Sequence, residues 1–317
     1  MTLIVRDLRR NDFDDAENFV RARRAAMPFL VMTAEGFLHD LAHAHPDKKF
    51  RLLVAEEDGE VLGTAQAGLA HEAPEPGLAF VNPYVRPDRL RRGAGALLLR
   101  TAEEHLARQG ARRVFSWVLD EPGNRDFAAR HGYLPARQAH FLRLDLAAGP
   151  LPPLPERMPP GVEVRSAASF TADPRPLFRL DAECAADEPS DVGSRLENYE
   201  EWLQDTWDHP LTDRELTTVV LVDGLLAAFC LAETDGLSRY HSGMTGTARA
   251  FRGRGLAKLA KNASLHRARA AGYREAFTGN DSDNGPMLAI NESFGYRRCG
   301  TEVRHVRELG GPRGTDS

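Results

Sequence analysis

The segment AFRGRGLAKLAK at positions 250–261 combines two arginines and two glycines with the start of an alanine-rich helix. Glycine lets the backbone approach a ligand closely, and a helix start presents unpaired N–H groups at the positive end of the helix dipole. Together they predict a site for an anion, most often a phosphate. Lys258 and Lys261, two of only four lysines, lie on one face of this helix, for which a solvated face is the alternative interpretation.

Three phosphate-binding motifs compete for this turn. A P-loop requires a lysine and then serine or threonine after its glycines, and this pair is missing. A dinucleotide fingerprint requires a third glycine three residues after the second, where Lys258 stands. The third motif is arginine or glutamine, two residues, glycine, one residue, and then glycine or alanine, and Arg252, Gly255 and Ala257 fit it. Pyrophosphate of coenzyme A would then lie on the N–H groups of Arg252, Gly253, Arg254, Gly255, Leu256 and Ala257.

The same pattern occurs twice, on either side of a proline-rich stretch at positions 146–161. RRGAGALLLRTAEEHLARQGARRV in the first half matches RGRGLAKLAKNASLHRARAAGYREA in the second, and in both the glycines that flank the helix are 17 positions apart. Each half also has an Asp-Gly pair between apolar runs, which indicates a β-hairpin. We therefore predict a tandem duplication, with copies at 1–147 and 161–312, a linker at 148–160 and a disordered tail at 313–317.

Each copy has the pattern of a strand, a helical region, a hairpin, a strand, the glycine-rich turn, a helix, a strand, a helix and a last strand. In the second copy Leu256, Leu259 and Leu265, with the alanines between them, give the long helix one apolar stripe. This order of elements predicts an α/β fold with a central mixed sheet.

On these residues the chain resembles the GCN5-related N-acetyltransferases, the GNAT superfamily, in a tandem arrangement. The second copy carries the strand and turn as MTGTARAFRGRGLA and the distal part as DNGPMLAINESFGY. The resemblance implies two GNAT-like domains, each a mixed, mostly antiparallel sheet flanked by helices, with acetyl-CoA as cosubstrate. It also implies that the pantetheine arm pairs with the strand before the turn and passes an early asparagine of the last helix, here Thr245, Gly246, Thr247 and Asn284.

The first copy departs from the family motif, because its turn reads LRRGAG and Leu90 replaces the arginine or glutamine. The rest of that turn still allows a phosphate cradle, formed by Arg91, Arg92, Gly93, Ala94 and Gly95. We expect the second copy to bind acetyl-CoA. For the first copy two alternatives stay open: it binds acetyl-CoA as well, or it is a decayed copy that completes the fold or the substrate cleft.

The reaction that the resemblance implies is attack of a neutral amine on a thioester, which needs a base for the amine and a donor for the thiolate. Glu233, near the end of a predicted core strand, is the first candidate for the base, with a solvated strand end as its alternative, and Asp235 and His241 follow. Many relatives have a tyrosine four residues before the Gly-aromatic pair, where Asn291 and Ala128 stand here. We predict that Asn291 donates a hydrogen bond to sulfur, with water as the alternative proton source.

The only indication of the amine that accepts the acetyl group is the charge of one segment. Twelve acidic residues and two arginines lie between Asp181 and Glu215. In the family's fold the early helices form a wall of the acceptor site, and an acidic wall attracts cations. A polyamine-like or aminosugar amine is therefore one hypothesis, and a solvated acidic helix is the other.

The overall composition of the chain excludes several classes of protein. A net charge of −5 argues against general nucleic-acid binding. The three cysteines lie far apart without metal-ligand spacing, so we expect reduced thiols, no metal and a cytoplasmic protein. No signal peptide or membrane span is predicted. An arginine-rich, lysine-poor composition suggests a GC-rich bacterial genome.

The leading hypothesis is an acetyl-CoA-dependent N-acetyltransferase that acts on a primary amine of a small molecule, with its active site in the second copy. An acyltransferase of small-thiol, mycothiol-like biosynthesis, which acetylates an amino-thiol sugar conjugate, is a close alternative. A non-catalytic acyl-CoA-binding or sensor module is the alternative from another class. The identity of the acceptor and the oligomeric state stay open.

Overall fold

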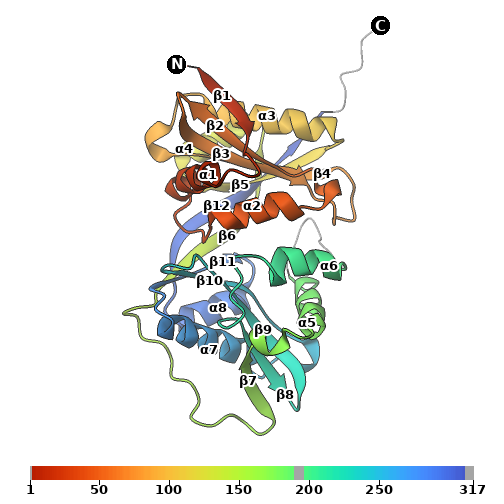
Figure 1. Cartoon of the computed structure of the whole chain (residues 1–317), viewed down its shortest axis with the longest axis vertical. Coiled ribbons are helices and arrows are strands. Elements are labelled where there is room, and N and C mark those ends of the chain that lie inside the picture. The colour runs from red at the N-terminus through yellow and green to blue at the C-terminus, as the bar shows by residue number, and fades with distance from the viewer. Residues whose placement is uncertain (1, 189–195, 311–317) are drawn as a thin grey trace. The chain divides into compact units, whose positions relative to one another are not determined.

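The computed structural model describes residues 2–188 and 196–310, and it divides into two compact units (Figure 1). The N-terminal unit comprises residues up to Pro28, Thr33–Ala139 and the residues from Thr301 onward, and the C-terminal unit comprises Phe29–Met32 and His140–Gly300. The compact units thus cross the boundaries of the sequence copies, because each takes its last strand from the other copy. The predicted tail at 313–317 lies outside the described residues.

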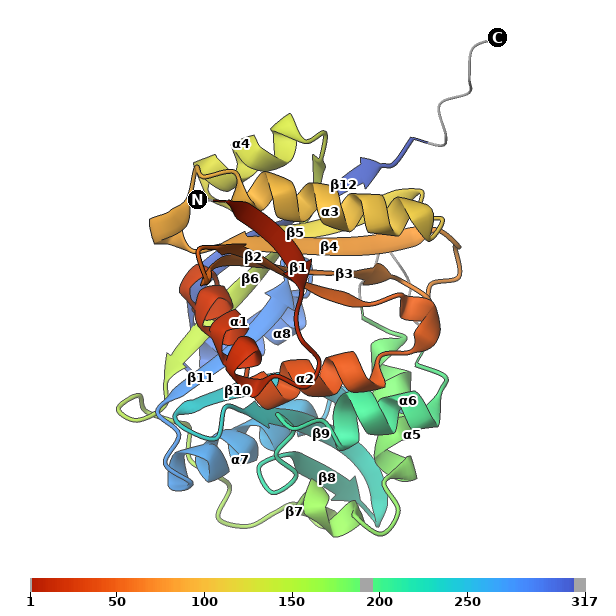
Figure 2. The same cartoon turned by 45° about the horizontal axis from the view of Figure 1, so that its top comes forward.

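The N-terminal unit is a mixed sheet between two layers of helices (Figure 2). Its strand order is β1-β2-β3-β4-β5-β12, in which β4 and β5 are parallel and the other neighbours are antiparallel. The strands are β1 (Leu3–Asp7), β2 (Arg51–Glu57), β3 (Glu60–Leu69), β4 (Leu78–Val85), β5 (Arg113–Leu119) and β12 (Arg297–Glu308). The helices are α1 (Phe13–Ala26) and α2 (Ala34–His43) on one face, and α3 (Ala94–Arg108) and α4 (Pro122–Arg130) on the other.

The C-terminal unit repeats this architecture in the order β6-β11-β10-β9-β8-β7. β10 and β11 are parallel, and β7 to β10 pair in antiparallel fashion. The strands are β6 (Leu134–Asp145), β7 (Val162–Ser166), β8 (Thr218–Val222), β9 (Leu225–Thr234), β10 (Arg239–Thr247) and β11 (Glu275–Asp281). The helices are α5 (Arg175–Ala185), α6 (Tyr199–Trp202), α7 (Leu256–Ala270) and α8 (Gly285–Ser293). The predicted α/β class with mixed sheets is confirmed.

The sequence patterns explain the local structure. Both Asp-Gly pairs form tight hairpin turns with left-handed residues, with φ of 51° at Asp58 and 50° at Asp223. The apolar stripe of α7 packs on the sheet, with Leu256 5% exposed and Leu265 0% exposed. All three cysteines are free thiols. Within the described residues, no helix has the length and apolar character that crossing a membrane requires.

The proline-rich segment lies against α7 in the C-terminal unit. Nδ2 of Asn262 donates to the carbonyl of Pro152 at 3.1 Å, and Nε of Arg269 donates to the carbonyl of Leu146 at 2.7 Å. The predicted linker is therefore an ordered strap bound to the helix that follows the glycine-rich turn.

Candidate active site

The glycine-rich turn before α7 forms a helix start without a cap. Arg252 is extended (φ −64°, ψ 161°), whereas Gly253 and Gly255 have left-handed φ values of 77° and 73°. Among the described residues, no side chain caps the helix at Gly255, and its first turn contains no acidic residue. The first N–H groups of α7 thus have no carbonyl partner within the helix, at the positive end of its dipole. The turn brings the predicted cradle residues Arg252–Ala257 together in a form that suits an anion.

The guanidinium group of Arg252 binds the protein itself. Its Nη2 donates to Asp187 at 2.5 Å, and its Nε donates to the carbonyl of Thr247 at 3.2 Å. Arg249 donates two further hydrogen bonds of 2.9 and 2.7 Å to Asp187. The hydrogen bonds from Arg249 and then from Arg252 lower the pKa of Asp187 far below its usual range. Side chains therefore fix the turn to β10 and to the segment after α5, while Arg254 is exposed.

β10 and β11 part in the middle of β10, at a place that we call the fork. The two strands pair only at Arg239, Tyr240 and His241 in the described part of the chain. On its other edge β10 has a bulge between Ser242 and Thr245, where its register with β9 shifts. A bulge interrupts the ladder and redirects neighbouring groups, and it is common beside active sites. Beyond the bulge, β10 pairs with β9 through the residues predicted to hold the pantetheine arm, Thr245, Gly246 and Thr247.

Gly246 on β10 lies in close contact with α5. A Cβ atom at Gly246 would overlap Sγ and Cβ of Cys184 on α5. The neighbouring Thr245 donates through Oγ1 to Sγ of Cys230 at 3.4 Å. Close packing thus explains the glycine, and pairing of this strand with pantetheine stays a prediction.

Glu233 and His241 form a hydrogen-bonded pair directly before the fork. They are cross-strand partners on β9 and β10, and Nδ1 of His241 lies 2.8 Å from Oε2 of Glu233. Their side chains are about one third exposed, at 30% for Glu233 and 29% for His241. Burial acts to raise the pKa of Glu233, but the hydrogen bond and charge of His241 and the charge of His209 lower it below its usual value. Glu233 is therefore a carboxylate at neutral pH that orients the imidazole and leaves Nε2 for proton transfer.

The other predicted acid–base residues take part in local structure. Oδ1 of Asp235 accepts three backbone N–H groups of the turn that follows it. Asn291 is 0% exposed, and its Nδ2 donates to Oδ1 of Asn280 at 2.5 Å. This placement favours a positioning role for Asn291, and donation to sulfur stays a prediction. Asn284 caps α8 by accepting the N–H of Met287 at 3.3 Å.

The first copy retains the backbone of the cradle. Leu90 has φ −65° and ψ 160°, close to the values of Arg252. Arg91 adopts a φ of 64°, where the second copy has Gly253, and Gly93 has a φ of 87°. α3 likewise begins without a side-chain cap and without an acidic residue in its first turn, as far as the structure describes the chain. Replacement of the motif arginine has therefore left the shape of the turn intact.

The first copy lacks the hydrogen-bonded pair and the bulge. Phe80 is the last residue of β4 that pairs with β5, and it lies opposite Gly68 on β3. These are the positions of His241 and Glu233, so neither partner titrates in the first copy. A Cβ atom at Gly68 would lie 2.9 Å from the Phe80 ring, which fills the space. β3 and β4 pair in continuous register from Gly63 to Leu69.

Several acids of the predicted acidic wall have partners within the fold. Asp181 accepts a hydrogen bond of 2.8 Å from Nε1 of Trp202, and burial raises its pKa to about 6. Glu183 accepts the N–H of Arg249 at 2.5 Å. Trp202 and Trp207 are core residues, 1% and 5% exposed. Part of the acidic segment, 189–195, lies outside the described residues.

Two features of the C-terminal unit were missed from the sequence. One is the pairing of Glu233 with His241, which the cross-strand register across the β9–β10 turn would have revealed. The other is the burial of Lys261, which is 1% exposed, whereas Lys258 is exposed. The interpretation of the two lysines as one solvated helix face is therefore wrong for Lys261. The signal for Lys261 is its place among alanines that face the sheet.

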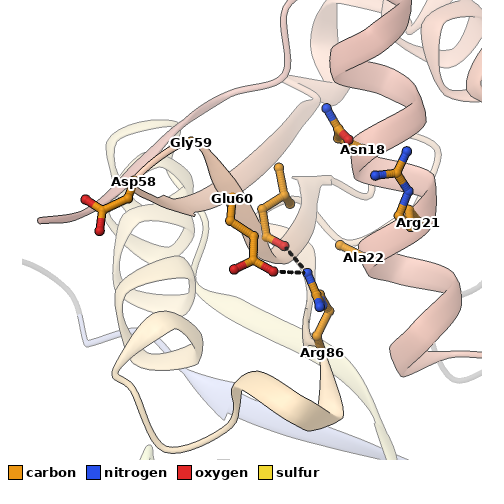
Figure 3. A pocket seen from close by; sticks show the side chains of 8 residues that line it. Asn18, Arg21, Ala22, Asp58, Gly59, Glu60 and Arg86 are labelled. Atoms are coloured by element: carbon orange, nitrogen blue, oxygen red, sulfur yellow. Dashed lines mark hydrogen bonds and ion pairs between the residues drawn. The ribbon is translucent and has the colours of Figure 1, made fainter. Parts of the chain in front are cut away.

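A pocket of about 310 Å³ lies in the N-terminal unit, between α1 and the turn that joins β2 to β3 (Figure 3). Arg21, Arg86, Asp58 and Glu60 are the charged residues that line it, and Glu60 contacts Arg86 directly. Nη1 of Arg86 donates to Glu60 at 2.6 Å, and Asp88 binds the same guanidinium. The charges of the lining thus neutralise one another, and the pocket contains none of the predicted site residues.

Comparison with known proteins agrees with this geometry. The model of the acetyltransferase (GNAT) family matches residues 16–133 and again 178–296. The mycothiol acetyltransferase of Gordonia bronchialis is 30% identical over 77% of this chain and 79% of its own length. That of Geodermatophilus obscurus is 30% identical over 90% of each chain. A tandem GNAT protein from the clavulanic acid biosynthesis pathway has the same fold, with a TM-score of 0.72 over 98% of this chain and 100% of that chain, at 21% identity.

A family model that matches both halves confirms the tandem arrangement predicted from the sequence. The relatives are enzymes that transfer an acetyl group, so the non-catalytic module is not supported. The chain belongs to the GNAT family of acetyltransferases and is an acetyl-CoA-dependent N-acetyltransferase with two GNAT domains in tandem.

Proposed function

We propose that the C-terminal copy carries out the acetyl transfer and that the Glu233–His241 pair is its base. The observation that carries this proposal is the position of the pair at the fork, in the same unit as the uncapped turn. The first copy has the turn but holds Gly68 and Phe80 where the pair stands. The first copy can therefore bind an anion or complete the fold, but it has no titratable side chain at these two positions to transfer a proton.

The roles of the residues follow from their places. The pyrophosphate of acetyl-CoA lies on the N–H groups from Arg252 to Ala257, and the pantetheine arm follows the edge of β10 toward the fork. Nε2 of His241 takes the proton of the acceptor amine, and Glu233 stabilises the imidazolium that results. The freed lone pair forms the N–C bond, the C–S bond breaks, and the thiolate leaves.

We infer a small molecule with a primary amine as the acceptor, with the amine of a mycothiol precursor as the first candidate. The named relatives are mycothiol acetyltransferases. A polyamine is the weaker candidate, because Asp181, Glu183 and Asp187 have partners inside the protein and offer less charge to a polycation.

The test is release of free thiol from acetyl-CoA in the presence of a panel of amines: a mycothiol precursor, aminosugars and polyamines. Thiol release that depends on one class of amine identifies the acceptor. Glu233→Gln is expected to lower turnover with that amine, and unchanged turnover in this variant would remove the base assignment. Calorimetric titration of acetyl-CoA gives the number of sites, and loss of one site in a Gly255 variant assigns it to the C-terminal copy.

A further inference from the structure

Two glycines lie directly beyond the fork of the second copy. The last pair of β10 and β11 is His241 with Phe277. Two positions further along each strand the chain has Gly243 and Gly279. A Cβ atom at Gly279 would meet no heavy atom of the described residues within 4 Å, apart from its own chain neighbours, and its φ lies outside the left-handed region. The backbone at Gly279 would therefore accept a side chain.

The first copy has large side chains at the same two positions. Its strands β4 and β5 pair for the last time at Phe80 and Phe115. Counted from there, the equivalent residues are Asn82 and Trp117. Oδ1 of Asn82 accepts the backbone N–H of Trp117 at 2.9 Å. A side-chain oxygen thus takes the place of the main-chain carbonyl that a continued parallel ladder would offer, and it bridges the two strands after their ladder has ended.

Cations hold the indole of Trp117 in the first copy. The guanidinium groups of Arg137 and Arg304 each lie 5.7 Å from a ring centre of Trp117. Such cation–π contacts fix the orientation of the ring. The same fold therefore accommodates an asparagine and a tryptophan beyond its fork, and it does not require glycine at these places.

The position of Gly279 places it on the catalytic face of the sheet. Phe277 and Gly279 are two positions apart on β11, so their Cα–Cβ directions share one face. His241, as the partner of Phe277, projects to this face as well. The side-chain link across the second fork lies on the opposite face, where Oγ1 of Thr278 donates to the carbonyl of Ser242 at 3.0 Å. A side chain at position 279 would therefore project just beyond His241.

We propose that Gly243 and Gly279 keep a passage open beyond the fork of the second copy, through which the acetyl end of the pantetheine arm reaches the amine beside His241. The inference rests on the proposed function of this copy. Asn82 and Trp117 close the equivalent passage of the first copy.

The free edge of β10 leads to this passage. Beyond His241, β10 has no ladder partner on the β11 side among the described strands. An extended amide chain that starts at the cradle can pair along such an edge and arrives at the fork. A large side chain on the face of His241 would then stand between the thioester and the amine, whereas glycine leaves that space free.

Of the two glycines, only Gly279 can be replaced without a clash. A Cβ atom at Gly243 would lie 3.1 Å from Cδ2 of Leu231 on β9. An asparagine at that position would have to displace the leucine, so a loss of activity there would have two explanations. The experiment therefore changes Gly279.

The first test installs the residue of the first copy in the whole protein. Gly279→Trp should lower kcat/KM for acetyl transfer by at least about a hundredfold, because the reacting groups no longer meet. Gly279→Ala adds a single methyl group and should lose less than about threefold. The nucleotide part of coenzyme A without its arm, adenosine 3′-phosphate 5′-diphosphate, should bind both variants within about twofold of the wild-type affinity, measured by calorimetry. The control Asn82→Gly, which removes the bridge of the first copy, should leave turnover unchanged.

A second measurement does not depend on whether the tryptophan variant folds. Gly279→Cys, combined with Cys299→Ser, adds a thiol at an exposed position, while Cys184 and Cys230 are buried. Saturating acetyl-CoA should slow alkylation of this thiol by iodoacetamide by at least about tenfold. The nucleotide without the arm should not slow it.

Several results would overturn the inference. They are unchanged turnover in a folded Gly279→Trp protein, equal losses in Gly279→Trp and Gly279→Ala, a parallel loss of nucleotide affinity, and a thiol at position 279 that acetyl-CoA does not protect. Thermal unfolding shows whether each variant folds. The two proposals fail in different ways. If the wild-type protein releases no thiol with any amine, the proposed function fails, whereas amine-dependent release that Gly279→Trp leaves intact contradicts the passage alone.

Discussion

The two copies have nearly the same turn before their long helix and very different surroundings at the fork. Leu90 and Arg252 share their backbone angles within a few degrees, and Arg91 takes the left-handed conformation of Gly253. In contrast, the pair at the fork is Glu233 with His241 in one copy and Gly68 with Phe80 in the other. A cradle made of backbone N–H groups does not depend on which side chains the turn carries. Acid–base chemistry depends on the side chains, and replacement of the two residues of the pair removes it.

The β-bulge in β10 is a second difference between the two copies. β10 shifts register against β9 between Ser242 and Thr245, whereas β3 and β4 stay paired without a shift. A continuous ladder pairs the alternate N–H groups that a strand points at its neighbour, and a bulge leaves one residue of the strand unpaired. The C-terminal copy thus has an interrupted strand, with the Glu233–His241 pair on one face and buried polar side chains on the other, whereas the N-terminal copy has a continuous ladder with apolar side chains.

The largest effect is expected from converting the C-terminal pair to the residue of the first copy. His241→Phe removes the proton acceptor, and thiol release with the acceptor amine should fall by between about a hundredfold and ten-thousandfold. Because the pKa of Glu233 is lowered, its carboxylate stays ionised below the usual carboxyl range, so Glu233 should not limit the rate at mildly acidic pH. The control Phe80→His should leave turnover unchanged. A similar loss in both variants would show that the first copy also takes part in the chemistry.

A smaller effect, on binding, is expected at the second glycine of the turn. Gly255 has a φ of 73°, and a side chain at this angle is strained by about 1–2 kcal/mol. Gly255→Val should therefore distort the cradle and weaken acetyl-CoA binding by at least about tenfold, measured by calorimetry. The matched variant Gly93→Val perturbs a φ of 87° in the first copy. If the loss follows Gly93 and not Gly255, the assignment of the main site to the second copy is wrong.

The left-handed residue before that glycine offers a test of stability. Arg91 has a φ of 64° without being glycine, so Arg91→Gly should remove strain and stabilise the protein by up to about 1 kcal/mol, less the entropy cost of glycine. Gly253→Arg should destabilise it by a similar amount. Denaturant unfolding measures both changes. A loss of stability in Arg91→Gly would mean that contacts of the Arg91 side chain outweigh the strain at its backbone.

Much of the fold was predictable because it depends on local patterns. The repeated spacing of Gly93 and Gly255, the two Asp-Gly turns and the apolar stripe of α7 each reflect short-range geometry. The repeat itself predicted the tandem arrangement, and the family resemblance added the GNAT fold and the cosubstrate. The exchange of last strands was not predictable, because β6 and β12 have the pattern of ordinary edge strands whichever sheet they join. The partners of the charged residues could not be predicted either. The sequence places Asp187 in the predicted acidic wall, but its carboxylate binds Arg249 and Arg252.

The ion pair between Arg252 and Asp187 is expected to have the smallest effect on acetyl-CoA affinity. Its removal also compares the two turns directly. Arg252 fits the motif, but its guanidinium binds Asp187 and the Thr247 carbonyl, while the first copy forms the same turn with Leu90. Arg252→Leu should therefore change the acetyl-CoA affinity by no more than about fivefold, the range of an exposed ion pair, and added salt should reduce the difference. Leu90→Arg should have as little effect in the first copy. A loss of a hundredfold or more in Arg252→Leu would mean that the guanidinium leaves Asp187 and binds the pyrophosphate directly, in which case Leu90 alone would explain a first copy without acetyl-CoA.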